Sequence, residues 1–111
     1  MTVAAIDRQV FDTLHANVGA DFVVELIDTF AVEAPQLMAE LRSAQASGAT
    51  EPFRRAAHAL KSNGNAFGAT RFAEAARAFE LGGPEVATRD IDALAQEFER
   101  ALAELRKLSH G

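Results

Sequence analysis

Hydrophobic side chains recur every three or four residues along most of this chain, which is the repeat of an α-helix. The most regular stretch runs from Thr88 to Leu108, where the apolar residues share a single stripe. Similar stripes occupy residues 7–19, 21–48, 50–68 and 70–82, and strand-forming residues are scarce. The pattern predicts one short helix followed by four long ones, each with one buried face.

Polar capping residues and glycines divide these stripes into separate helices. We expect four side chains to cap the amino ends of helices, and glycines to end them. The short turn near residue 69 makes a tight hairpin, so residues equally far from it lie at similar heights. His58 is then level with Phe79 or Glu80, and Lys61 is level with Arg77. The expected caps are Asp7, Asp21, Thr50 and Thr70, and the expected stops are Gly19, Gly48, Gly68 and Gly82 with Gly83 and Pro84.

Two residues interrupt otherwise regular helical stripes. Pro35 lies inside the second stripe, whose phase is the same on both sides of it. A proline inside a helix costs about 3 kcal/mol, so we expect one long helix bent at Pro35, with a broken pair of helices as the lesser option. Gly64 lies on the apolar stripe of residues 50–68. Since an interior glycine costs about 1 kcal/mol relative to alanine, its position indicates a close approach of another helix.

The simplest fold that buries all these stripes is an all-α, up-down-up-down four-helix bundle, with the short first helix covering one end. The chain of 111 residues is long enough for one core, so we expect a single domain over residues 1–111. Hydrophobic residues make up 49% of it, and all eight aromatic residues are phenylalanine. We expect the phenylalanines at helical spacing in the core. Its compact ends favour a free-standing module.

Composition excludes several classes of function. The net charge of −5 argues against general affinity for nucleic acid, which needs a basic face. The absence of cysteine excludes disulfide and thiol chemistry within the chain and fits a cytoplasmic location. The sequence also shows no membrane span and no signal peptide, so we expect no membrane association.

The polar face of residues 50–69 carries the most suggestive chemistry. His58 lies there among cations and small polar side chains, opposite the apolar stripe. A neutral imidazole is a nucleophile near pH 7 and suits phosphoryl transfer. Lys61, one turn further on, can stabilise charge on phosphoryl oxygens, and Glu80 can accept a hydrogen bond from Nδ1 of His58, leaving Nε2 to react. The other polar residues of this surface are Arg54, Arg55, Ser62 and Asn65, with Arg77 on the following helix.

The run of His58, Leu60, Lys61 and Ser62, followed by Phe67, Gly68 and Ala69, resembles the signature of histidine-containing phosphotransfer (HPt) domains. That signature is H-x-L-K, a small residue, four variable positions, and then hydrophobic-Gly-Ala. The resemblance extends more loosely upstream, through Ile6, Asp7 and Pro35, and downstream through Glu80. It implies a phosphorelay carrier that accepts a phosphoryl group on His58 from a receiver-domain aspartate or a sensor kinase and passes it to a response regulator.

The resemblance also implies particular roles and partners. At the Glu80 position the family often has a ring-orienting Gln or Glu, and at the Ser62 position a Gly or Ser that leaves room for a visiting aspartyl phosphate. We expect receiver and kinase domains to dock on the surface around His58, and we expect a monomer with no ATP-dependent activity and no cofactor. The residues assigned to docking are Arg54, Arg55, Ala59, Ser62, Asn65 and Arg77. The three arginines are also compatible with an ordinary solvated face.

Two other functions are compatible with the same helices. In the first, His58 is inert and its face serves a helical adaptor that docks a receiver or kinase domain. The second, a metal site in the bundle core, is disfavoured because no Glu-x-x-His pair occurs, so we expect no metal. His15 and His110 have no comparable neighbours and are given no role.

Overall fold

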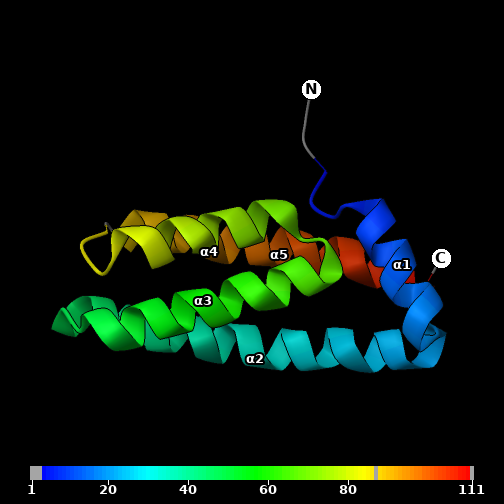
Figure 1. Ribbon diagram of the computed structural model, residues 1–111, viewed down its shortest axis with the longest axis horizontal. Coiled ribbons are helices and arrows are strands. Elements are labelled where there is room, and N and C mark those ends of the chain that lie inside the picture. Colours follow the sequence, from blue (N-terminus) through cyan, green and yellow to red (C-terminus); the bar gives the residue numbers. More distant parts are fainter. Residues whose placement is uncertain (1–3, 87, 111) are drawn as a thin grey trace.

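The computed structural model describes residues 4–86 and 88–110, and these residues form five α-helices without a strand (Figure 1). The all-α class expected from the sequence is therefore confirmed. Residues 1–3 and 111, the ends of the predicted domain, lie outside the described residues. The helices are α1 (Arg8–Val18), α2 (Ala20–Ser47), α3 (Thr50–Phe67), α4 (Thr70–Gly82) and α5 (Thr88–His110).

The four long helices pack side by side as a bundle (Figure 1). α3 packs between α2 and α4, and α5 closes the bundle against α2 and α4. α1 lies at one end and packs on α2 and α3, as expected for a covering helix (Figure 1). No helix in the described residues is long and apolar enough to cross a membrane.

Phenylalanine rings fill the centre of the core. Phe30 contacts Phe67, Phe72 and Phe98, at ring-centroid distances of 5.2, 5.8 and 5.2 Å. These rings come from all four long helices, so they join the bundle at one level. The phenylalanines at helical spacing are buried as expected, and Phe22, which the predicted stripe does not include, is 48% exposed near the start of α2.

α3 and α4 approach closely at Gly64, as expected for a glycine on an apolar stripe. A Cβ atom on Gly64 would lie 2.8 Å from Cδ2 of Phe72 and 3.2 Å from Cβ of Ala73. Both neighbours belong to α4 and are buried. Gly64 therefore sets the small separation of the two helices that carry the candidate site.

Gly68 ends α3 and also receives α1. Its φ of 76° is in the left-handed region that favours glycine, which closes the helix as expected. Its carbonyl oxygen accepts a hydrogen bond of 2.7 Å from the backbone N–H of Asp7. A Cβ atom on Gly68 would lie 2.8 Å from the carbonyl oxygen of Asp7 and 2.9 Å from Cβ of Val10. The start of α1 therefore rests directly on Gly68.

The two aspartate caps have different outcomes. Asp7 caps α1 as predicted, because its Oδ1 accepts a hydrogen bond of 3.0 Å from the backbone N–H of Gln9. The prediction for Asp21 is wrong: α2 already begins at Ala20, and Gly19 alone separates it from α1. Asp21 lies instead in the first turn of α2, where its negative charge suits the helix dipole.

The predicted caps at Thr50 and Thr70 are each wrong by one residue. Ala49 and Ala69 occupy the cap positions of α3 and α4, and neither helix has a side-chain cap. Thr50 and Thr70 are the first helical residues. The hydroxyl of Thr70 donates a hydrogen bond of 3.3 Å to the carbonyl of Gly68, so it is directed toward the preceding turn.

α2 is one continuous helix across Pro35, so the alternative of two helices is wrong. The ribbon of α2 shows no sharp change of direction in the view of Figure 1. Pro35 itself is exposed, which places its missing N–H on the solvent side of the helix.

Candidate functional site

α3 holds His58 on the side opposite its buried stripe. The buried side of this helix is made of Phe53, Ala56, Ala57, Leu60, Gly64 and Phe67. The His58 side chain is 59% exposed, and Ser62 and Asn65 are also exposed. The buried stripe fixes the rotation of α3, so the same packing that stabilises the helix directs the imidazole toward solvent.

Glu80 of α4 reaches His58 across the hairpin. Its Oε2 lies 2.7 Å from Nδ1 of the imidazole. Its other oxygen, Oε1, accepts a hydrogen bond of 2.7 Å from Nζ of Lys61. One carboxylate therefore contacts both the candidate nucleophile and the nearest cation. The hairpin turn places His58 and Glu80 at the same height on the two helices, as predicted, although they are 22 residues apart in sequence.

The contact between Lys61 and Glu80 was not predicted. The hairpin argument placed Lys61 level with Arg77, one turn from Glu80, and a flexible four-carbon side chain spans that difference. Both side chains of this pair are 24% exposed, so they are more covered than the imidazole. The sequence did contain a signal for this contact: Glu80 on α4 and Lys61 on α3 have opposite charges and lie at similar distances from the hairpin turn.

These two contacts lower the pKa of Glu80 below its ordinary value. The hydrogen bond from Lys61 is the larger cause and the hydrogen bond with His58 is the second. Glu80 is therefore ionised at neutral pH, and an ionised carboxylate only accepts hydrogen bonds. The ring nitrogen beside it must then be the donor, which assigns a proton to Nδ1 and, in the neutral ring, leaves the lone pair on Nε2.

The three arginines lie around this centre without contacting the ring. Arg54, Arg55 and Arg77 are all exposed. Arg55 makes a long ion pair of 4.0 Å with Glu51, one turn away on α3. These side chains provide a positive surface near His58 rather than ligands held at a fixed position.

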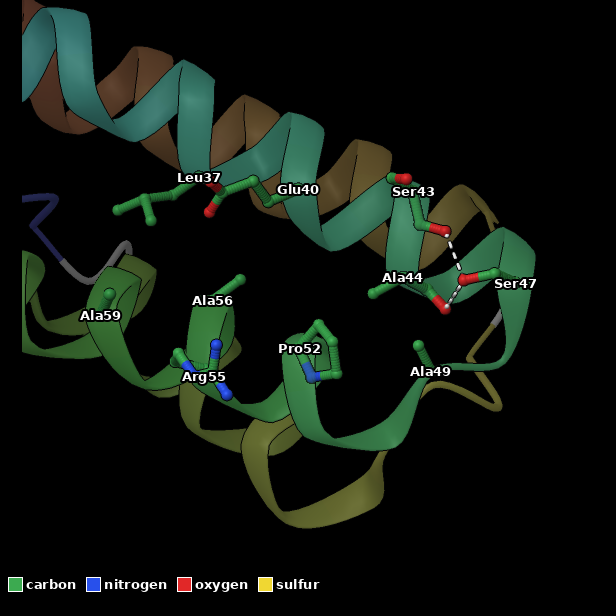
Figure 2. Close-up of a pocket in the computed structure, with 10 residues that line it drawn as sticks. All are labelled: Leu37, Glu40, Ser43, Ala44, Ser47, Ala49, Pro52, Arg55, Ala56 and Ala59. Atoms are coloured by element: carbon green, nitrogen blue, oxygen red, sulfur yellow. Dashed lines mark hydrogen bonds between the residues drawn. The ribbon is translucent and has the colours of Figure 1, made fainter.

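A groove of about 580 Å³ runs beside the site, between α2 and α3 (Figure 2). Figure 2 shows Leu37, Glu40 and Ser43 of α2 facing Pro52 and Ala56 of α3 across it. Two residues assigned to docking, Arg55 and Ala59, belong to its lining. The groove was not predicted, because its width depends on small side chains from two helices that are adjacent only in the folded bundle.

The described residues contain no cluster of side chains suited to a metal ion. His, Asp and Glu side chains do not gather there in groups of three or more that could hold a metal ion.

A helical bundle with an exposed imidazole, hydrogen-bonded at one ring nitrogen and close to a lysine, is the arrangement that the sequence resemblance implied. The family model for the Hpt domain matches residues 25–107, and the chain belongs to this family. The class acts in two-component phosphorelays, where its members are phosphocarriers rather than kinases and interact with receiver domains and histidine kinases.

A solved structure of a histidine-containing phosphotransfer protein has a similar fold. The chain is similar to histidine-containing phosphotransfer protein B (HptB) from Pseudomonas aeruginosa PAO1, with 25% sequence identity and a TM-score of 0.72. The alignment covers 98% of this chain and 94% of that one. No curated protein sequence matches the chain.

Proposed function

We propose that His58 is the phosphoacceptor of this module and carries the phosphoryl group on Nε2. The observation that supports this most directly is the 2.7 Å contact between Nδ1 and the ionised Glu80, on an imidazole that is 59% exposed. The contact orients the ring and leaves Nε2 as the nitrogen with a free lone pair. The exposure of the ring lets an aspartyl phosphate on another protein approach it.

Transfer requires little from the protein beyond position and charge. The phosphoryl group passes through a loose transition state, in which its three outer oxygens carry the negative charge. Lys61 lies one turn from His58 on the same helix, and its ammonium group is held at this level by Glu80. It can turn from the carboxylate to the phosphoryl oxygens over a short distance, and Arg54, Arg55 and Arg77 add a weaker field.

Docking of receiver domains is proposed for the surface that joins His58 to the groove between α2 and α3. Arg55 and Ala59 belong to both, and the small side chains of the groove leave room for a protruding element of a partner. Ser62 and Asn65 extend this surface along α3, and both are exposed. The module acts as a monomer in the cytoplasm, needs no cofactor, and has no ATP-dependent activity of its own.

The test is phosphorylation of the intact chain by a phosphorylated receiver domain. We expect a phosphate that is labile in acid and stable in base, and that is lost in His58→Gln. The matched control is His110→Gln, which removes another exposed histidine and should leave labelling unchanged. Absence of label with receiver binding retained would refute the phosphoacceptor role and support the adaptor function instead.

A further inference from the structure

Leu81 is an exposed apolar side chain beside the candidate site. It follows Glu80 directly in α4 and is 65% exposed, more than any other large hydrophobic side chain among the described residues. A single exposed leucine needs no explanation in general. This one is the neighbour in sequence of the residue whose carboxylate lies 2.7 Å from the His58 ring. Its apolar surface is therefore close to the nitrogen that a phosphoryl donor must reach.

Helical geometry turns Leu81 onto the outer face of α4. Successive residues differ by about 100° around the axis, so Leu81 is rotated by that angle from Glu80, away from the edge that contacts α3 and toward solvent. Arg77 is four residues earlier, and so lies one turn away on the same face, where it is also exposed. The outer face of α4 therefore presents a cation and an apolar side chain together. The opposite, buried side consists of Phe72, Ala73, Ala76 and Phe79.

Arg54 of α3 supplies a second cation beside Leu81. A Cβ atom on Gly83 would lie 3.8 Å from Nη2 of Arg54, so the guanidinium reaches across to the carboxyl end of α4. The carbonyl groups at that end carry partial negative charge, which favours a cation there. Leu81 thus has Arg77 one turn before it and the Arg54 guanidinium beside the residues that follow it.

A partner that exchanges a phosphoryl group with His58 covers a broad area around the ring. The phosphorus has to come within roughly 3–3.5 Å of Nε2, in line with the bond that forms. Even a transient interface covers about 600 Å² on each partner, which is a disc of about 14 Å radius. A disc of that size centred on the ring reaches Leu81 on one side, just as it reaches Ala59 and the groove on the other.

We propose that Leu81 is an apolar anchor for the receiver domain and extends its docking surface from α3 onto α4. This inference rests on the proposed role of His58 and adds a residue that the resemblance to HPt domains did not supply. An apolar side chain of the receiver, beside its phosphorylated aspartate, packs on Leu81. The aspartyl phosphate is negatively charged, and the flanking Arg77 and Arg54 attract it. An apolar centre within a polar rim is the usual anatomy of a protein interface.

The experiment measures single-turnover phosphoryl transfer from a phosphorylated receiver domain to the wild-type chain and to Leu81→Ser, over a range of receiver concentrations. We expect the half-saturating receiver concentration to rise about fivefold to tenfold and the maximal rate to stay unchanged, because the contact is equally strong before and during transfer. Leu81→Met keeps an apolar side chain of similar volume and should stay within about twofold of the wild type. Equal half-saturating concentrations for the wild type and Leu81→Ser would overturn the inference.

Val32→Ser is the matched control, because it removes another exposed apolar side chain far from the ring. Val32 is 61% exposed and lies on α2 one turn from Asp28. The carboxylate of Asp28 pairs with Arg106 of α5 at 3.3 Å, so this face of α2 is turned toward α5 rather than α3. Val32→Ser should transfer like the wild type. An equal rise in this variant would assign the effect to a general loss of apolar surface and overturn the anchor role.

Phosphoramidate separates this inference from the proposed function, because so small a donor needs no docking surface. Leu81→Ser should be labelled on His58 as fast as the wild type and should melt at the same temperature. Slower labelling by phosphoramidate would show that the substitution disturbs the ring itself, and would overturn the anchor role. A wild-type chain that neither phosphoramidate nor the receiver can label would overturn the phosphoacceptor role, and the anchor role with it.

A second measurement needs no variant. Unphosphorylated receiver domain is added to the wild-type chain labelled with ¹³C in its methyl groups. We expect the methyl resonances of Leu81 to shift and those of Val32 to stay in place. Leu81 resonances that do not move at a saturating receiver concentration would also overturn the inference.

Discussion

Gly68 offers the sharpest test of how the fold is assembled, because a second glycine provides a matched control. Gly48 and Gly68 both end long helices in the left-handed conformation, with φ of 67° and 76°. A Cβ atom on Gly48 would have no neighbour within 4 Å, whereas on Gly68 it would meet the carbonyl oxygen of Asp7 at 2.8 Å. The two substitutions to alanine therefore share the conformational cost and differ in the contact with α1.

The conformational cost and the cost of the contact with α1 can be estimated separately. An alanine in the left-handed region costs about 1–2 kcal/mol, partly offset by about 0.4–1 kcal/mol from the stiffer unfolded chain, so Gly48→Ala should destabilise by about 1 kcal/mol. Gly68→Ala adds overpacking against α1, which costs about 1–3 kcal/mol. Its total loss should be about 2–4 kcal/mol, a large part of the stability of an ordinary small domain.

Urea unfolding of both variants gives the two free energies of unfolding, and hydrogen exchange of the α1 amides shows where the loss arises. We expect faster exchange in α1 for Gly68→Ala only, because its clash falls on the backbone of Asp7. Equal destabilisation of the two variants, within about 0.5 kcal/mol, would refute the conclusion that α1 rests on Gly68.

Three further outcomes are expected. Gly64→Ala should lower the free energy of unfolding by about 1 kcal/mol, because overpacking against the buried Phe72 outweighs the gain in helix propensity of about 1 kcal/mol; a more stable variant would contradict this. Ser62→Trp should slow phosphoryl transfer by about tenfold to a hundredfold with an unchanged melting temperature, and an unchanged rate would exclude a need for clearance there. The pKa of Glu80 is lowered, mainly by Lys61, so its ion pairs stabilise the fold above the pKa of the unfolded chain and are lost as the pH falls through the pKa of the folded chain. The difference in free energy of unfolding between the wild type and Glu80→Gln, measured by urea unfolding, should therefore shrink below about pH 4. A difference that stays constant with pH would be inconsistent with the lowered pKa.

The helices and their packing into a bundle could be predicted because both follow from repeating patterns of apolar residues. Each apolar stripe corresponds to a buried face, and glycines at 19, 48 and 68 end helices as expected. The contact of His58 with Glu80 could also be predicted, because a short hairpin converts sequence distance into height along two packed helices. Periodicity and a turn position were enough for both.

Other features depend on three-dimensional detail that a pattern does not contain. The caps at Thr50 and Thr70 were misplaced by one residue, since the backbone geometry of the turn chooses the cap, and alanines occupy those positions here. The bond from Lys61 to Glu80 depends on the reach of a flexible side chain.

The tight pairing of α3 with α4 makes the site depend on an exact count of residues. One residue inserted between Gly68 and Glu80 would turn the carboxylate by about 100° around the axis of α4, away from the imidazole. The same insertion in the loop that follows Gly83 would leave both helices in register. A change in length between the turn and Glu80 would therefore remove the acid from the imidazole in a single step.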